Sequence, residues 1–63
     1  MADVEVRNEG TIFLFRPLTE AAREWLAENV DEEAMYYGEF LVVEHRYADD
    51  LAQGMIDDGL EVV

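Results

Sequence analysis

The chain has 63 residues, no cysteine, and 16 acidic side chains against four arginines, which gives a formal net charge of −12. Without cysteine it can form neither a disulfide nor a thiolate metal site. A chain of this length buries only about 60% of its unfolded surface, so its core must be small. Its hydrophobic content of 51% nevertheless predicts one folded domain over residues 1–63 and excludes a disordered acidic tail.

The opening MADVEVRNEG lacks both the basic start and the apolar run of a signal peptide, which predicts a cytoplasmic protein. No apolar stretch approaches the roughly 20 residues that a membrane span needs. A surface this negative repels nucleic acid and anionic membranes, and it attracts basic protein surfaces. The alternative is that the acidity serves only to keep a small protein soluble.

The first third of the chain predicts a β-hairpin. Residues 2–7 alternate apolar and polar side chains at Val4 and Val6, as in a strand with one buried face. The turn residues of Asn8–Gly10 separate this strand from the apolar run TIFLF at 11–15. Because that second run is apolar on both faces, it should be either an interior strand or a strand whose second face meets something other than the core.

An amphipathic helix is expected over residues 20–29. Pro17 ends the preceding strand, and Thr19 is a favourable N-cap. Apolar side chains then recur at helical spacing, with Trp25 as the expected core anchor. Residues 31–37 predict a loop or a single helical turn, in which Tyr36 and Tyr37 cannot both point inward.

The stretch 38–63 reads as strand, helix, strand. The continuous apolar run FLVV within residues 39–44 predicts a buried strand. A single apolar stripe then marks a helix over about 47–58, which Gly59 would close in a left-handed conformation. Residues 60–63 predict a short last strand.

The element order β-β-α-β-α-β predicts a small two-layer α/β sandwich of the α+β type. Because strand–helix–strand connections place their strands parallel, we expect a short, mostly parallel sheet with an antiparallel hairpin at its edge. Both helices should cover one face. The other face should expose either Phe13 and Phe15 or Ile12 and Leu14.

The composition excludes most catalytic chemistry. The chain contains no serine, cysteine or lysine, which removes the usual nucleophiles, Schiff bases and phosphate-binding loops. His45 beside Glu44 could act as an acid or base, but no nucleophile accompanies it, and a structural role at the helix start is favoured. The acidic residues 57–61 do not match the spacing of an EF-hand. We therefore expect no enzyme, no cofactor and no dedicated metal site.

The acidic residues give the one functional hypothesis. Asp49 and Asp50 suit the start of the second helix, whereas Asp57 and Asp58 lie at its end, where the helix dipole favours cations. Since local stability does not explain that placement, we expect carboxylates on rigid helices to imitate phosphates and to bind a basic partner. The null alternative is a solvated helix face. The expected partner-binding residues are Glu20, Glu24, Glu28, Tyr36, Tyr37, Asp49, Asp50, Asp57, Asp58 and Glu61.

Three short motifs support a resemblance. They are RPLTEAA at 16–22, WLAENV at 25–30 and DGLEV at 58–62. With the segments around them, they resemble a group of short, uncharacterised bacterial and prophage proteins, which implies a bacterial cytoplasm but no established activity. In size and acidity alone, the chain is also similar to anti-CRISPR and anti-restriction proteins of phages.

Two functions are therefore expected as alternatives. The first is a non-enzymatic inhibitor that occupies the basic surface of a nucleic-acid-handling protein, as a monomer or weak homodimer, without contacting nucleic acid or membrane itself. The second is a structural or regulatory homo-oligomer that buries an exposed apolar face of the sheet, the one carrying Phe13 and Phe15.

Overall fold

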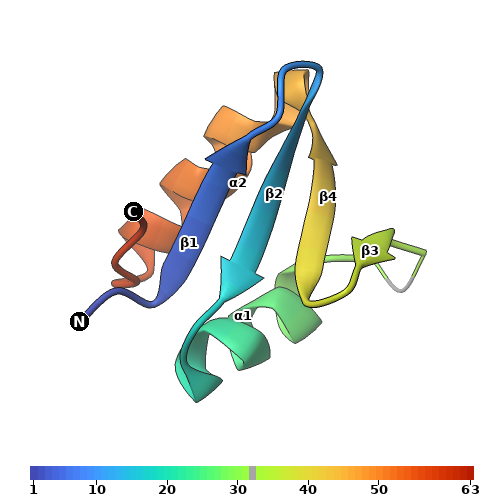
Figure 1. Ribbon diagram of the computed structural model, residues 1–63. Helices are drawn as coiled ribbons and strands as arrows, with labels where there is room; N and C mark the ends of the chain where they lie inside the picture. Colours follow the sequence, from blue (N-terminus) through green and yellow to red (C-terminus); the bar gives the residue numbers. More distant parts are fainter. Residues whose placement is uncertain (32) are drawn as a thin grey trace.

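A four-stranded sheet with both helices behind it makes up the fold (Figure 1). This computed structural model describes residues 1–31 and 33–63. The elements are β1 (Val4–Asn8), β2 (Ile12–Pro17), α1 (Glu20–Asn29), β3 (Tyr36–Tyr37), β4 (Phe40–Glu44) and α2 (His45–Asp57). Neither helix of this described part is long and apolar enough to cross a membrane.

The predicted hairpin is confirmed. β1 pairs antiparallel with β2 from Val4 opposite Pro17 to Asn8 opposite Phe13. In the turn, Oδ1 of Asn8 accepts a hydrogen bond of 2.9 Å from the backbone N–H of Gly10. Gly10 has a φ of 92°, a conformation that a residue with a β-carbon rarely adopts.

The expectation of a mostly parallel sheet is wrong. The strand order is β1-β2-β4-β3, and every pair of neighbouring strands is antiparallel. The reason lies in the connection between β2 and β4. Helix α1 lies across the end of the sheet where β2 finishes, so the chain enters β4 from that same end (Figure 1). A parallel crossover would require the helix to return along the length of the sheet.

The short strand β3 was expected to be a loop or a helical turn. Tyr36 pairs with Leu41 and Tyr37 with Phe40, and Gly38 forms the reversal between the two strands with a φ of 61°. A two-residue strand gives too short a pattern for its alternation to be recognised in the sequence.

The last predicted strand is reduced to a single bridge. Val62 pairs in parallel with Val4, and the N–H of Val6 donates to the C=O of Val63 over 2.9 Å. Because β1 and β4 both run antiparallel to β2, the C-terminal residues run in the same direction as β4. The segment after α2 therefore runs parallel to β4, as predicted, but it forms a single bridge and not a strand.

The boundaries of α1 are those predicted. The hydroxyl of Thr19 caps the helix by accepting a 3.2 Å hydrogen bond from the N–H of Ala22. Helix α2 begins at His45, two residues before the predicted start, because the chain turns into the helix directly after the last residue of β4.

Helix α2 ends as the position of Gly59 predicts. The N–H of Leu60 donates to the C=O of Met55, the N–H of Gly59 donates to the C=O of Ile56, and Gly59 has a φ of 93°. These two hydrogen bonds form a Schellman motif, which satisfies carbonyl groups that the end of a helix leaves unpaired.

One core lies between the sheet and the two helices. Phe15 is fully buried and faces α1 and α2, and Phe13 packs against the same core. Ile12 and Leu14 therefore occupy the opposite, open face of the sheet. The face that carries Phe13 and Phe15 therefore lies against the helices and not against solvent. Of the two residues expected as the alternative on the open face, Ile12 is partly exposed, whereas Leu14 is buried. The core consists of Val4, Phe15, Ala22, Leu26, Leu41, Val43, Ala48 and Met55.

Gly54 lies in the interior of α2, where glycine costs about 1 kcal/mol relative to alanine. A β-carbon at this position would lie 3.4 Å and 3.6 Å from two ring atoms of Trp25, which is ordinary van der Waals contact. We therefore expect Gly54→Ala to raise the free energy of unfolding by up to about 1 kcal/mol, as measured by urea denaturation. A loss of stability would instead show that the Trp25 ring has no room to adjust.

Candidate functional site

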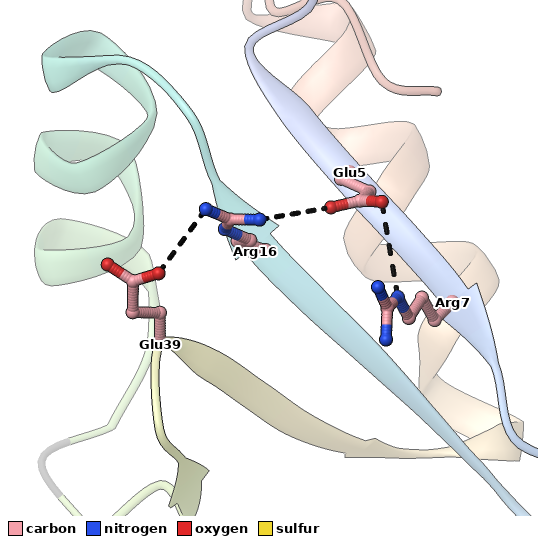
Figure 2. A network of polar contacts seen from close by, with 4 residues as sticks. All are labelled: Glu5, Arg7, Arg16 and Glu39. Atoms are coloured by element: carbon pink, nitrogen blue, oxygen red, sulfur yellow. Dashed lines mark ion pairs between the residues drawn. The ribbon is translucent and has the colours of Figure 1, made fainter.

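The open face of the sheet carries a chain of ion pairs between β1, β2 and the β3–β4 turn (Figure 2). Arg16 lies 3.7 Å from Glu5 and 3.4 Å from Glu39, and Arg7 lies 4.0 Å from Glu5. The guanidinium groups of Arg7 and Arg16 also lie 5.0 Å and 5.9 Å from the centre of the Phe40 ring. The arginines thus partly cover the apolar open face.

The negative charge is segregated from these ion pairs. The remaining ion pair of the described residues joins Arg46 to Glu44 over 3.3 Å. Together the ion pairs contain three arginines and three glutamates, so they are neutral in sum. Arg23 and the other thirteen acidic residues of the sequence therefore account for the whole formal charge of −12. Most of those thirteen lie on the helices, the segments next to them and the termini.

Helix α1 presents a row of carboxylates. Glu20, Glu24 and Glu28 are exposed and recur every four residues, opposite the buried side chains of Ala22 and Leu26. At a rise of 1.5 Å per residue, successive carboxylates are about 6 Å apart along the helix axis. Like charges at this spacing repel one another, so the row costs about 0.2–0.5 kcal/mol per neighbouring pair.

Helix α2 adds three exposed aspartates, Asp49, Asp50 and Asp57. The expectation that Asp49 and Asp50 favour the start of the helix is wrong, because α2 begins at His45 and its first turn contains no acidic residue. Asp57 accepts a 3.0 Å hydrogen bond from the side chain of Gln53, one turn earlier. We call Glu20, Glu24, Glu28, Asp49, Asp50 and Asp57 the acidic helix surface.

Asp58 has a local structural role that the sequence analysis missed. Its Oδ2 accepts a 2.6 Å hydrogen bond from the indole N–H of Trp25, which joins the end of α2 to the middle of α1. The inference that local stability does not explain Asp57 and Asp58 is therefore wrong, since each accepts a side-chain hydrogen bond. Trp25 itself is half-buried, with one edge packed on the core and the other exposed.

The other expected partner-binding residues lie elsewhere. Tyr36 and Tyr37 are both exposed, at 52% and 74%, which agrees with the expectation that they cannot both point inward. They form β3 at the far edge of the sheet, whereas Glu61 lies beside the start of β1. The structure therefore brings six of the ten expected residues onto the two helices and leaves these three, with Asp58, outside the acidic helix surface.

Asp3 joins three segments that are distant in the sequence. Its Oδ1 accepts from the hydroxyl of Thr19 over 2.8 Å, and its Oδ2 accepts from the N–H of Glu61 over 2.9 Å. Its backbone C=O accepts a 2.7 Å hydrogen bond from the N–H of Leu18. The hydrogen bond from Glu61, followed by that from Thr19, lowers the pKa of Asp3 below its ordinary value because both stabilise the ionised carboxylate.

This lowered pKa predicts a loss of stability in acid. A carboxyl group whose pKa is lower in the folded state stabilises the fold above its unfolded pKa of about 3.8, and that stabilisation is lost as the pH falls through the folded value. We expect Asp3→Asn to be less stable than the wild type at pH 7, and to lose less stability than the wild type between pH 5 and pH 3. Urea denaturation at these pH values measures both effects.

A control separates this specific effect from that of charge. Glu9→Gln in the β1–β2 turn removes one negative charge without removing a side-chain hydrogen bond recorded for the described residues, so its pH dependence should match that of the wild type. An Asp3→Asn variant with an unchanged loss of stability in acid would assign that loss to other carboxylates.

His45 is exposed and lies where β4 passes directly into α2. It is the first residue of α2, its N–H donates to the C=O of Thr11 over 3.3 Å, and its ring lies 5.5 Å from the ring of Phe13. Within residues 1–31 and 33–63, no group of three or more histidine or carboxylate side chains is arranged to hold a metal ion.

Comparison with known proteins gives no match: no family model, no curated protein and no solved structure is significantly similar to the chain. The resemblance drawn from the three sequence motifs therefore stays a prediction.

Proposed function

We propose that this protein is a non-enzymatic inhibitor that binds the basic surface of a nucleic-acid-handling protein and prevents nucleic acid from binding there. The observation that carries the proposal is the segregation of charge: the described ion pairs are neutral in sum, and the entire −12 lies outside them. An anti-CRISPR or related anti-defence protein in the bacterial cytoplasm is the most specific form of this proposal.

The acidic helix surface has no cation partner among the ion pairs of the described residues. Repulsion between the exposed carboxylates of the row lowers the stability of the fold. Cations of a basic partner would offset this repulsion and would be attracted to the row. On α1 the carboxylates recur about every 6 Å, whereas one strand of duplex DNA carries a phosphate about every 3.4 Å of its axis. One helix therefore reproduces about half of that charge density, and a second acidic helix raises it.

Capture and competition test the proposal. The immobilised protein should retain a nucleic-acid-binding protein from nuclease-treated bacterial lysate, and short oligonucleotides should displace that protein. A variant in which the acidic helix surface is neutralised, with Gln for its glutamates and Asn for its aspartates, should retain none. Asp58 stays unchanged in this variant because its contact with Trp25 supports the fold.

The design makes failure easy to recognise. If the neutralised variant folds and retains the same protein in the same amount, the acidic helix surface does not bind it. If oligonucleotides fail to displace the captured protein, the two ligands do not share a site, and inhibition by competition is excluded.

The open face of the sheet favours a second candidate, a homo-oligomer. Ile12, Phe40 and Val42 are partly exposed there, and the ion pairs around them are neutral in sum, so two copies can approach through this face despite their charge. Light scattering at low and at high salt distinguishes the candidates. A dimer at both salt concentrations that Val42→Arg dissociates supports the oligomer, and a monomer at both removes it.

A further inference from the structure

A groove opens between the two helices, over the inner face of β4. Its volume is about 700 Å³, within the range of sites that hold a ligand or a side-chain cluster. It is lined by Trp25 of α1 and by Tyr47 and Leu51 of α2, together with Leu41 and Val43 of β4. The groove exists because α1 lies across the end of the sheet while α2 runs away from β4 behind β1 (Figure 1).

The walls of the groove are more exposed than core packing requires. Tyr47 is 53% exposed although it belongs to the apolar stripe of α2, and Trp25 is only half-buried. The interior of α2 has a glycine where it passes Trp25, and this glycine also lines the groove. Large aromatic side chains next to a small residue form the kind of surface that receives an apolar anchor from a partner.

The charged residues that line the groove in the described part of the chain are acidic: Asp31, Glu44 and Asp50. One cation lies beside them, because the guanidinium of Arg46 is 5.0 Å from the centre of the Tyr47 ring. Glu44 is engaged by Arg46, whereas Asp31 and Asp50 take part in none of the ion pairs of the described residues. An apolar floor within a negative rim is complementary to an apolar side chain flanked by arginine or lysine.

We infer that this groove is the docking site for a basic, amphipathic segment of a partner protein, whose large apolar side chain enters between Trp25 and Tyr47 while its cations meet Asp50 and Asp31. This inference rests on the proposed function, because it places the contact with the basic partner. It adds an apolar anchor to that contact, which an imitation of phosphates does not need.

The test uses two synthetic peptides of equal charge. Both are arginine-rich, and only one carries a pair of leucines one helical turn apart, which are serines in the other. Trp25 is the single tryptophan of the chain, so its fluorescence reports directly on the groove wall. The leucine peptide should bind about tenfold more tightly than the serine peptide and should shift the Trp25 emission.

Matched variants locate the binding. Tyr47→Ser and Ile56→Ser each remove an apolar side chain from α2 of nearly equal exposure, 53% and 51%, but only Tyr47 lines the groove. Asp50→Asn and Glu9→Gln each remove one negative charge, and only Asp50 lines the groove, whereas Glu9 lies in the β1–β2 turn outside the acidic helix surface. The groove variants should weaken the leucine peptide about fivefold or more, and the controls should change its affinity less than twofold.

Two results would overturn the inference while leaving the proposed function intact. The first is equal binding of the two peptides, with equal effects of Glu9→Gln and Asp50→Asn, because the protein would then attract cations through its overall charge and not through the groove. The second is that neither peptide binds although the lysate protein is captured. If neither peptide binds and nothing is captured, the proposed function fails as well.

Discussion

A Glu24→Lys variant should be more stable than the wild type and should bind its partner about tenfold more weakly. Glu24 is the middle member of the carboxylate row on α1, with Glu20 and Glu28 one turn away on either side. The substitution replaces two repulsive pairs by two attractive ones, which should raise the free energy of unfolding by about 0.8–2 kcal/mol at low salt. Binding should weaken because a carboxylate aimed at the basic partner becomes a cation.

Urea denaturation and competition for the captured protein measure the two effects. The gain in stability should largely disappear in 1 M NaCl, where the Debye length is about 3 Å. Glu9→Lys is the matched control, because it changes the net charge equally but lies in the β1–β2 turn. If Glu9→Lys weakens binding as much as Glu24→Lys, total charge governs the interaction and the position on α1 does not.

A Phe15→Ala variant should lose a large part of the stability of the domain. Phe15 is fully buried in β2, between Val6 of β1 and Leu41 of β4, and it faces both helices. Removing a buried phenylalanine side chain costs about 3–5 kcal/mol. At 0.05–0.15 kcal/mol per residue, a chain of this length has a total stability of about 3–9 kcal/mol, so this loss removes about a third of it or more.

Phe13→Ala is the matched control for this substitution. Phe13 lies on the same strand and the same face but is only half-buried, so its truncation should cost about 1–2 kcal/mol and leave the domain folded. Circular dichroism during urea denaturation distinguishes the two. Equal losses would mean that the core does not centre on Phe15.

The sequence predicts the local elements well because each has a local cause. The cap at Thr19, the turn at Gly10 and the helix end at Gly59 depend on side chains and backbone conformations within a few residues. The direction of β4 has no such local cause. It depends on where the C-terminal end of α1 lies relative to the sheet. A preference for parallel crossovers applies only when the helix returns along the sheet, and periodicity does not report the path of a helix.

The sequence predicted which kind of residue forms the candidate site, but it predicted the positions and contacts of these residues only in part. Net charge and helical spacing are sufficient to expect acidic helix faces. They do not reveal that Asp58 accepts a hydrogen bond from the indole N–H of Trp25, thirty-three residues away. Nor do they reveal that Asp3 accepts hydrogen bonds from Thr19 and Glu61. Nor do they reveal the groove. Tyr47 and Trp25 lie on the apolar sides of their helices, which predicts that both are core residues, and only the angle between the helices shows that they line a groove.

The segregation of charge between the two sides of the sheet also gives this molecule a permanent electric dipole moment. Its overall extents are only 26 × 22 × 19 Å, comparable to a few Debye lengths at physiological ionic strength. The field of a cationic partner therefore exerts a torque that turns the helices toward that partner before contact, which raises the fraction of productive collisions. On arrival, the open face of the sheet points back into solvent, where a second molecule can reach it.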